Sequence, residues 1–261
     1  MKVFILLPCY NEERALPLLC HKVKTMFEKD KQEYEIVIVN DGSSDRTLSI
    51  SQSLSKEIPI HIIDHVVNKG LGKAMKNGLS YISETGSDED VAIALDADNT
   101  HDPLLIRSMI RKMKVMNADV VIASRYAEAG KEVGLALHRK ILSLGASTVL
   151  KTFFRIKGVR DYTCGYRAYS VPILKKAHNV FRDNFVEETG FVCMAEILIK
   201  LNLINAKIDE VGLVLRYDKK EGKSKMKIFK TINRYISLLS KSKRIITNNR
   251  LLVEKSLKGT A

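Results

Sequence analysis

A short apolar run that ends in two carboxylates constrains the fold of this chain more than any other feature. Residues 91–101 read V-A-I-A-L-D-A-D-N-T-H. Five apolar residues are too few for most helices and are typical of a strand that is buried on both faces of a sheet. Side chains two apart in a strand point to the same side. Asp96 and Asp98 therefore converge at the carboxyl end of the strand, where open α/β sheets bind ligands.

A pair of carboxylates at one strand end suggests a site for a divalent cation. Asp96 and Asp98 repel each other unless a cation lies between them, and hard oxygen ligands favour Mg²⁺ or Mn²⁺. Such a cation commonly completes its coordination with the phosphates of a substrate. The same residues would also suit a strand-end turn with solvated side chains, so the stretch on its own leaves both interpretations open.

The first half of the chain alternates between apolar runs and amphipathic segments. We expect strands at residues 2–7, 34–39, 58–65, 91–95 and 118–124. Helices are expected at residues 11–27 with Asn11 as the N-cap, from residue 44 or 45 with Asp45 as the N-cap, and at residues 70–82 and 103–116. This alternation predicts an α/β fold in which helices cover both faces of a mainly parallel sheet.

The alternation breaks after residue 124. Residues 135–156 and 188–201 are predicted to be helices, and residues 161–170 and 207–217 are predicted to be strands. Residues 225–246 place apolar side chains at helical spacing opposite lysines and arginines, which predicts a basic amphipathic helix. We therefore divide the chain into a sheet-forming domain, residues 1–218, and a basic C-terminal extension, residues 219–261.

The net charge of +13 is concentrated near the C-terminus. Residues 216–258 contain fourteen Lys or Arg and three acidic residues, a net of +11, so the remainder carries about +2. A dense basic face beside an apolar stripe favours binding to an anionic membrane surface over a merely solvated face. The predicted helix at 135–156 is also flanked by basic residues, and its pattern suits either a membrane surface or the protein core.

The composition and the N-terminal segment indicate a compartment. The four cysteines lack the spacing of a disulfide framework, which suits a reducing cytoplasm. The first apolar run is short and ends at Pro8, unlike a signal peptide. Since no apolar stretch approaches the ~20 residues that a membrane span needs, we expect a peripheral protein at the inner face of the membrane. No P-loop or dinucleotide fingerprint is present.

The D-A-D-x-x-H segment resembles the metal-binding signature of family 2 glycosyltransferases, which have the GT-A fold. P-C-Y-N-E at 8–12, N-D-G-S-S-D at 40–45, S-R-Y at 124–126, G-Y-R-A-Y at 165–169 and G-K-S-K at 222–225 follow in the order found in polyprenyl-phosphate (dolichyl-phosphate) mannosyltransferases. Each motif is weak alone, but together they cover nearly the whole chain. The resemblance implies an inverting, metal-dependent transfer of a hexose, mannose before glucose, from a nucleotide diphosphate sugar to a polyprenyl phosphate at a membrane surface.

The resemblance also implies which residues bind the sugar donor, GDP-mannose before UDP-glucose. These residues are Pro8, Tyr10, Glu12, Val39, Asp41, Asp96, Ala97, Asp98, Arg125, Lys219 and Lys225. Asp96 and Asp98 would hold Mg²⁺ or Mn²⁺, together with Thr100, which stands where the family often has Gln. Lys219 and Lys225 would neutralise the charge that develops on the leaving diphosphate.

A second group of residues matches the family's pocket for the lipid phosphate. Arg125, Arg139 and Ser143 form this group, and with Asp98 they make up the expected catalytic set; Arg167 is expected to join the basic lining. A phosphate monoester has its second pKa near ~6 and is largely dianionic at pH 7. Such an acceptor needs cations to position it, and the planar fork of Arg suits phosphate, so no general base is required.

Two other functions stay open at this point. The same fold could act on a sugar or peptide hydroxyl with Glu187 or Glu188 as the general base, although charged residues that open a helix are the simpler interpretation. A non-catalytic protein that binds nucleic acid through the basic tail is the third candidate, but it leaves the aspartates unexplained. We therefore expect no nucleic-acid partner, and leave open a membrane protein that would supply spanning helices.

Overall fold

The computed structural model describes residues 1–220, 228–240 and 247. Its main sheet contains seven strands in the order β3-β2-β1-β4-β7-β5-β8. The strands are β1 (Val3–Cys9), β2 (Tyr34–Asp41), β3 (Ile60–His65), β4 (Val91–Ala94), β5 (Val120–Ser124), β7 (Arg167–Ser170) and β8 (Ile208–Gly212). Neighbouring strands are parallel except where β7 pairs with β4 and β5. The predicted mainly parallel sheet is confirmed.

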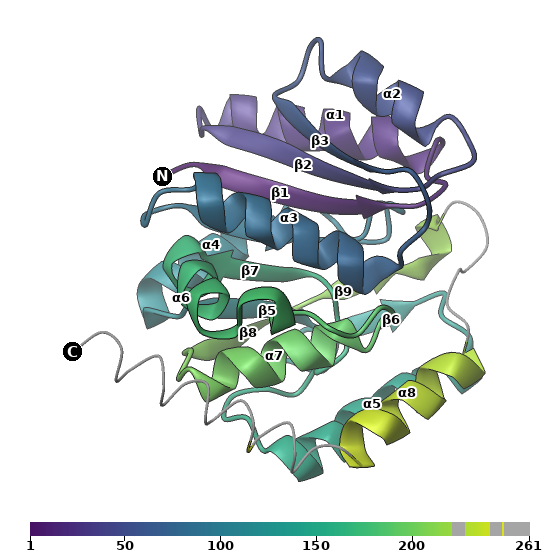
Figure 1. The fold of residues 1–261 in the computed structure, drawn as a ribbon, viewed down its shortest axis with the longest axis vertical. Coiled ribbons are helices and arrows are strands. Elements are labelled where there is room, and N and C mark those ends of the chain that lie inside the picture. The colour runs from purple at the N-terminus through teal and green to yellow at the C-terminus, as the bar shows by residue number, and fades with distance from the viewer. Residues whose placement is uncertain (221–227, 241–246, 248–261) are drawn as a thin grey trace.

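Helices cover both faces of this sheet (Figure 1). One face carries α3 (Leu71–Thr85), α6 (Val171–Phe181) and α7 (Cys193–Leu203), and the other carries α1 (Ala15–Lys29), α2 (Thr47–Leu54) and α4 (Leu105–Met116). Helices α5 (Leu137–Phe154) and α8 (Ile228–Ser240) pack side by side apart from the sheet. Short 3₁₀ turns, η1 (Arg182–Asn184) and η2 (Tyr217–Lys219), and a small parallel pair, β6 (Lys131–Val133) with β9 (Val214–Arg216), complete the described elements.

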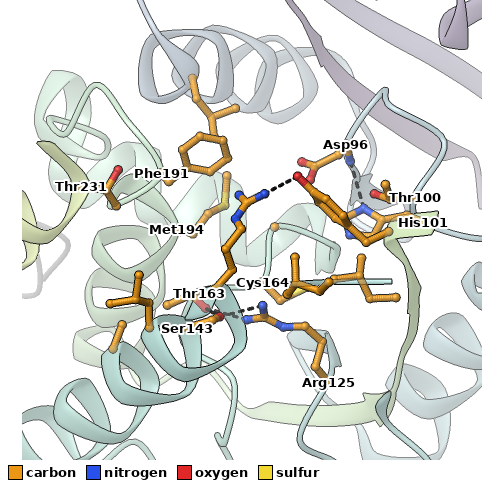
Figure 2. Close-up of a pocket in the computed structure, with 18 of the residues that line it drawn as sticks. Asp96, Thr100, His101, Arg125, Ser143, Thr163, Cys164, Phe191, Met194 and Thr231 are labelled. Carbon is orange, nitrogen blue, oxygen red and sulfur yellow. Dashed lines mark hydrogen bonds between the residues drawn. The ribbon is translucent and has the colours of Figure 1, made fainter. Parts of the chain in front are cut away.

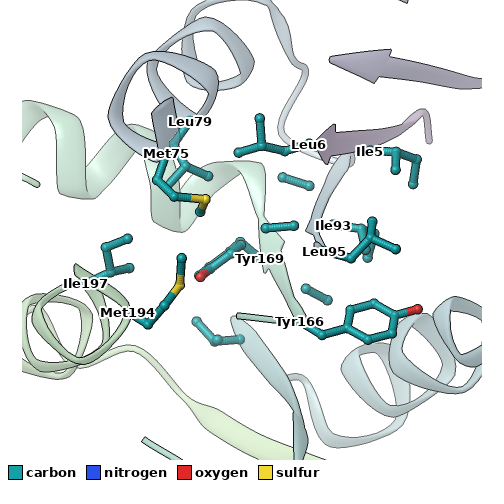
Figure 3. Packing of buried hydrophobic residues seen from close by; sticks show 14 of the residues in the cluster. Ile5, Leu6, Met75, Leu79, Ile93, Leu95, Tyr166, Tyr169, Met194 and Ile197 are labelled. Carbon is teal, nitrogen blue, oxygen red and sulfur yellow. The ribbon is translucent and has the colours of Figure 1, made fainter. Parts of the chain in front are cut away.

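The core lies where the central strands meet the helices (Figure 3). Leu6 of β1 and Ile93 of β4 are both fully buried, and Met75 and Leu79 of α3 belong to the same apolar cluster. Helix α3 lies so close to β1 that a Cβ added at Gly78 would come within 2.2 Å of the Leu6 side chain. Because β4 is covered on both faces, only its carboxyl end is open to a ligand, as the apolar run at 91–95 predicts.

The entry to α1 differs from the prediction. The helix begins at Ala15 rather than at Asn11, which adopts a left-handed conformation with φ 54°. The Asn11 side chain instead accepts a hydrogen bond from the backbone N–H of Ser44 at 2.8 Å. Asp45 accepts from Thr47 N at 2.9 Å and from Glu13 N at 3.1 Å, so it ties the start of α2 to the β1–α1 loop. The side chains of Asn11 and Asp45 therefore connect the β1–α1 loop with the segment before α2, and do more than cap the predicted helices.

The region after residue 124 departs further from the expectations. Only the last four residues of the predicted strand at 161–170 form β7, and the predicted strand at 207–217 is split into β8 and β9. Helix α6 was not expected, although Ser170 caps it by accepting from Ile173 N at 3.4 Å and a proline stands in its first turn. Such a Ser-x-Pro start is a known helix signal.

The C-terminal part is described only partly. Helix α8 covers residues 228–240 of the amphipathic helix expected at 225–246, and the rest of that segment lies outside the described residues. Across the described ranges, the structure has no helix of sufficient length and apolar character to span a membrane. The division at residue 218 stays a prediction.

Candidate functional site

Two cavities meet at the carboxyl end of β4. A larger one of about 710 Å³ extends toward the ends of β1 and β2, and a smaller one of about 200 Å³ extends toward α5. Asp96, Asp98, Arg139 and Tyr217 line both cavities, so the two spaces join at the paired aspartates. Pockets at this edge of an α/β sheet are its usual ligand sites.

The two aspartates differ in their surroundings. The backbone N–H of Asp96 lies 3.2 Å from His101 Nδ1 (Figure 2). The His101 ring stacks on Tyr166, with ring centroids 5.0 Å apart. Asp98 accepts from the Thr100 hydroxyl at 2.6 Å. Burial raises the pKa of Asp96. Burial also acts on Asp98, but Lys220 and the Thr100 hydroxyl outweigh it and hold the pKa of Asp98 below its ordinary value.

The donor set suits a hard divalent cation. Asp96 and Asp98 supply carboxylate oxygens at one strand end, and the ammonium of Lys220 pairs with Asp98, which shows that this carboxylate attracts a cation. Within residues 1–220, 228–240 and 247, no three His, Cys, Asp or Glu side chains form a closed metal site. A metal held here would therefore need ligands from a substrate, as Mg²⁺ commonly does. Thr100 contacts Asp98 and so orients the carboxylate.

The larger cavity gathers predicted donor-binding residues from three strand ends. Pro8, Tyr10, Glu12, Asp41, Asp96, Ala97 and Asp98 all line it. Asp41 is buried and organises its surroundings: it accepts from the backbone N–H groups of Lys69 and Gly70, each at 2.8 Å, and pairs with His65 Nδ1 at 2.8 Å. Asn77 in turn contacts His65 Nε2 at 2.9 Å. The carboxylate thus fixes the loop before α3 that forms one wall of the cavity.

The smaller cavity gathers the predicted acceptor-binding residues. Arg125, Arg139 and Ser143 line it, and Figure 2 shows the Arg125 guanidinium directed at Ser143 and Thr163, with Asp96 and His101 across the cavity. Arg125 forms a bidentate pair with the buried carboxylate of Asp161, with both N···O distances 2.7 Å. It also donates to the Ser143 hydroxyl at 2.8 Å.

Turn η2 crosses from one cavity to the other. The Arg139 guanidinium donates to the Tyr217 hydroxyl and lies over the Tyr217 ring, 5.0 Å from its centroid. Three residues later Lys220 pairs with Asp98. The segment 217–220 therefore contacts both the expected phosphate pocket and the paired aspartates, and it precedes the G-K-S-K segment, which lies outside the described residues.

Three predicted site residues lie elsewhere. Val39 is fully buried in β2, and Lys219 is exposed at the surface. Arg167 was expected in the phosphate pocket, but it is fully buried and donates to the backbone carbonyls of Met194 and Tyr162 at 2.6 and 2.9 Å. Its strand position directs it into the core instead. Lys225 lies outside the described residues.

Lys220, Tyr217 and Thr163 are three polar lining residues that were not among the predicted site residues. Lys220 was passed over for its neighbour Lys219, because sequence spacing does not tell which of two adjacent lysines turns inward. Lys220 lines the larger cavity, Thr163 lines the smaller one and Tyr217 lines both. Thr163 follows Asp161 by two residues, and a polar pair of this kind before G-Y-R was the only available signal.

Glu187 and Glu188, the candidate general bases, line neither cavity. Glu187 pairs with the buried Lys200 at 2.7 Å. The Glu188 carboxylate lies 3.9 Å from Arg234 of α8. Their segment is held tightly against α3, since a Cβ added at Gly72 would lie 1.6 Å from the Glu188 carbonyl oxygen. Both glutamates thus take part in packing the loop beside the site.

Sequence comparisons connect the chain to proteins of known name. The model for glycosyl transferase family 2 matches residues 4–177. A dolichol-phosphate mannosyltransferase of Pyrococcus furiosus is 32% identical over 237 residues, which cover 90% of this chain and 62% of that protein. An undecaprenyl-phosphate mannosyltransferase of Micrococcus luteus is 27% identical over 227 residues, covering 87% of this chain and 88% of the relative. A dolichyl-phosphate beta-glucosyltransferase of Trichomonas vaginalis is 32% identical over 235 residues, 86% of this chain and 68% of that one.

These relatives confirm the predicted resemblance to polyprenyl-phosphate glycosyltransferases. The chain nevertheless spans less than two thirds of the length of the Pyrococcus protein.

Solved structures show the same fold. Glucosyl-3-phosphoglycerate synthase from Mycobacterium tuberculosis, in complex with Mn²⁺ and UDP-glucose, aligns with a TM-score of 0.63 at 15% identity over 92% of this chain and 78% of that one. Residues 1–349 of TarS from S. aureus, in complex with UDP-GlcNAc, align with a TM-score of 0.54 at 18% identity over 82% of this chain and 57% of that one. The predicted GT-A fold is confirmed.

Proposed function

Because the chain belongs to glycosyl transferase family 2, we propose that it transfers a hexose from a nucleotide diphosphate sugar to a polyprenyl phosphate, with inversion at the anomeric carbon. One observation carries the proposal. Asp96 and Asp98 are the only acidic residues in the described lining of the smaller cavity, which also holds Arg125 and Arg139. An anionic acceptor that needs no base fits this lining better than a neutral hydroxyl.

The donor would occupy the larger cavity. We assign its nucleoside to the wall formed by Pro8, Tyr10 and Asp41, and its diphosphate to the junction beside Asp96 and Asp98. A Mg²⁺ or Mn²⁺ ion held by the two aspartates would neutralise the diphosphate charge when bound. Two of the relatives named above are mannosyltransferases and one is a glucosyltransferase, which supports GDP-mannose first and UDP-glucose second.

The acceptor phosphate would occupy the smaller cavity. One of its oxygens attacks the anomeric carbon as the bond from that carbon to the donor diphosphate breaks, so the nucleoside diphosphate leaves with the bonding electrons. Arg139 lies at the junction of both cavities and supplies a cation beside the attacking group. Lys220, which contacts Asp98, supplies a second cation beside the leaving group. Fixed cations at sites of developing charge are a major source of rate acceleration.

A membrane-surface location fits the acceptor and the exposed face of α5. Leu137, Ile141, Leu144, Val149 and Phe153 of this helix are all exposed, and Lys151 and Arg155 are exposed at its C-terminal end. An apolar face bordered by cations suits an anionic bilayer. Because α5 also carries Arg139 and Ser143, a lipid phosphate at the bilayer surface would reach the smaller cavity directly. No disulfide joins the four buried cysteines, which fits the reducing cytoplasmic side.

The variants Arg139→Ala and Glu187→Gln/Glu188→Gln separate a phosphate acceptor from a hydroxyl acceptor. We expect Arg139→Ala to lower kcat/KM for polyprenyl phosphate more than tenfold, since it removes a charge-assisted interaction worth roughly 1.5–3 kcal/mol. Arg139→Lys should recover only part of the activity, because it keeps the charge and loses the fork.

The double glutamine variant should retain kcat, because neither glutamate lines either of the two cavities at the aspartates. If it instead loses about 10²–10⁴-fold while Arg139→Ala is tolerated, the acceptor is a hydroxyl and the proposal is wrong.

A further inference from the structure

The guanidinium of Arg125 has no hydrogen-bond donor left for a phosphate. An arginine side chain carries five N–H groups. In Arg125, Nε donates to Asp161, Nη1 to Glu132 at 3.3 Å and Ser143 at 2.8 Å, and Nη2 to Asp161 and to Thr163 at 2.6 Å. Direct binding of an acceptor phosphate would therefore require one of these bonds to break.

The Asp161 contacts are the least able to break. Asp161 is fully buried, and its two oxygens accept from the Arg125 backbone N–H as well as from the guanidinium. One of them also accepts from the backbone N–H groups of Thr163 at 3.2 Å and Cys164 at 3.0 Å. Charge-assisted bidentate pairs of this kind are among the strongest hydrogen bonds in proteins. These contacts therefore fix the orientation of the Arg125 guanidinium.

The hydroxyls of Ser143 and Thr163, which Arg125 also contacts, are less buried than the Asp161 carboxylate. Ser143 and Thr163 line the smaller cavity, and both are only partly buried. A hydroxyl that accepts a hydrogen bond retains its own proton as a donor. For Thr163 the alternative acceptors are Asp161 Oδ1 at 3.3 Å, which already accepts three shorter bonds, and Ser143 Oγ at 3.5 Å. Both contacts are long, so an oxyanion in the cavity would be the better acceptor.

We propose that Thr163 is a further residue that binds the acceptor phosphate, and that Arg125 acts on this phosphate through the hydroxyls of Thr163 and Ser143. Each hydroxyl accepts from the guanidinium and donates its own proton into the cavity, which polarises it as a donor. Arg125 and Asp161 are then positioning residues, and Arg139 is the cation that contacts the phosphate directly. This inference rests on the proposed function.

Thr163→Val tests the proposal, because valine keeps the shape of threonine and removes the hydroxyl. With full-length protein, GDP-mannose or UDP-glucose, and a short isoprenyl phosphate as acceptor, we expect kcat/KM for the acceptor to fall roughly 10- to 100-fold. KM for the donor should stay unchanged. Thr163→Ser should restore most of the loss. Thr85→Val is the matched control, since Thr85 is exposed, lines neither cavity and donates its hydroxyl proton to the Tyr81 carbonyl at 2.8 Å.

The outcomes separate this inference from the proposed function. If the wild-type protein glycosylates the isoprenyl phosphate and Thr163→Val has the same acceptor kcat/KM, the inference is wrong and the proposed function stands. If Thr163→Ser is as poor as Thr163→Val, or if both donor and acceptor parameters fall together, Thr163 acts through packing and the inference is also wrong. If the wild type uses isoprenol and not isoprenyl phosphate, the proposed function itself fails.

Discussion

The Arg125–Asp161 pair should dominate the stability of the site, and Asp161→Asn measures its contribution. The side chains of Arg125 and Asp161 are 9% and 0% exposed. Removing one charge from a buried pair strands the other in a poorly solvated environment, which costs about 3–5 kcal/mol. Asparagine also turns one of the two acceptor oxygens into an amide donor, which faces N–H groups that need an acceptor. We therefore expect the free energy of unfolding to fall by about 3–5 kcal/mol.

The chain offers a matched control with the same geometry at the surface. Arg107 and Asp30 form a bidentate pair with both N···O distances 2.7 Å, but their side chains are 45% and 34% exposed. Asp30→Asn should cost at most about 1 kcal/mol, because water replaces the lost contact. Urea unfolding of the wild type and both variants, followed by circular dichroism, gives the two losses. Equal losses for the two variants would refute the argument that burial sets the energy of the Arg125–Asp161 pair.

The pH dependence of the stability lost in Asp161→Asn provides a second check on the Arg125–Asp161 pair. Burial alone would raise the pKa of Asp161, but the Arg125 guanidinium outweighs it and holds the pKa below its ordinary value. A carboxyl whose folded pKa is lowered contributes stability above its unfolded pKa, about 4, and loses that contribution as the pH falls through the folded pKa. The stability difference between wild type and Asp161→Asn should therefore be constant near neutrality and shrink below about pH 4. A difference that grows on acidification would contradict the assignment.

Two further predictions concern the metal and the membrane. Asp98→Asn should abolish transfer, because it removes a charge that would hold a divalent cation at the junction of the cavities. EDTA should abolish transfer by the wild type reversibly, because it removes the cation itself. Full activity of the variant in EDTA would rule out the metal site. The wild type should bind anionic vesicles less tightly as salt rises, since exposed charges are screened over about 8 Å at physiological ionic strength. Ile141→Ser/Phe153→Ser should weaken binding at every salt concentration, because both side chains are exposed on α5. The control Val115→Ser/Met116→Ser, at an exposed end of α4, should leave vesicle binding unchanged.

The sequence was most informative where apolar runs and charged residues coincide. The buried strand at 91–94 could be predicted because five consecutive apolar residues indicate a strand, and Asp96 and Asp98 follow its end and line both cavities. The donor-side residues Pro8, Tyr10, Glu12 and Asp41 likewise lie at or just after the carboxyl ends of β1 and β2, and they line one cavity. Local patterns place these residues because the parallel topology brings strand ends to one edge.

The acceptor side depends on contacts that no local pattern contains. Arg125 and Asp161 are 36 residues apart, and their pairing follows from the fold rather than from either motif. Arg167 resembled a lining residue, but its register in β7 against Ala94 places it in the core. Lys220 and Lys219 are equivalent in sequence, and only the backbone path through η2 decides which one reaches Asp98. Long-range pairing and side-chain direction set these positions, and both are tertiary properties.

Analysis of the lipid product tests the central claim most directly. Full-length protein would be incubated with GDP-mannose or UDP-glucose and a divalent cation, with either polyprenyl phosphate or the corresponding polyprenol as acceptor, and the lipids analysed by mass spectrometry. The account predicts a hexosyl-phosphoryl lipid in amounts equal to the nucleoside diphosphate released, and no product from the polyprenol. A glycosylated polyprenol, or nucleoside diphosphate release with no modified polyprenyl phosphate, would contradict it.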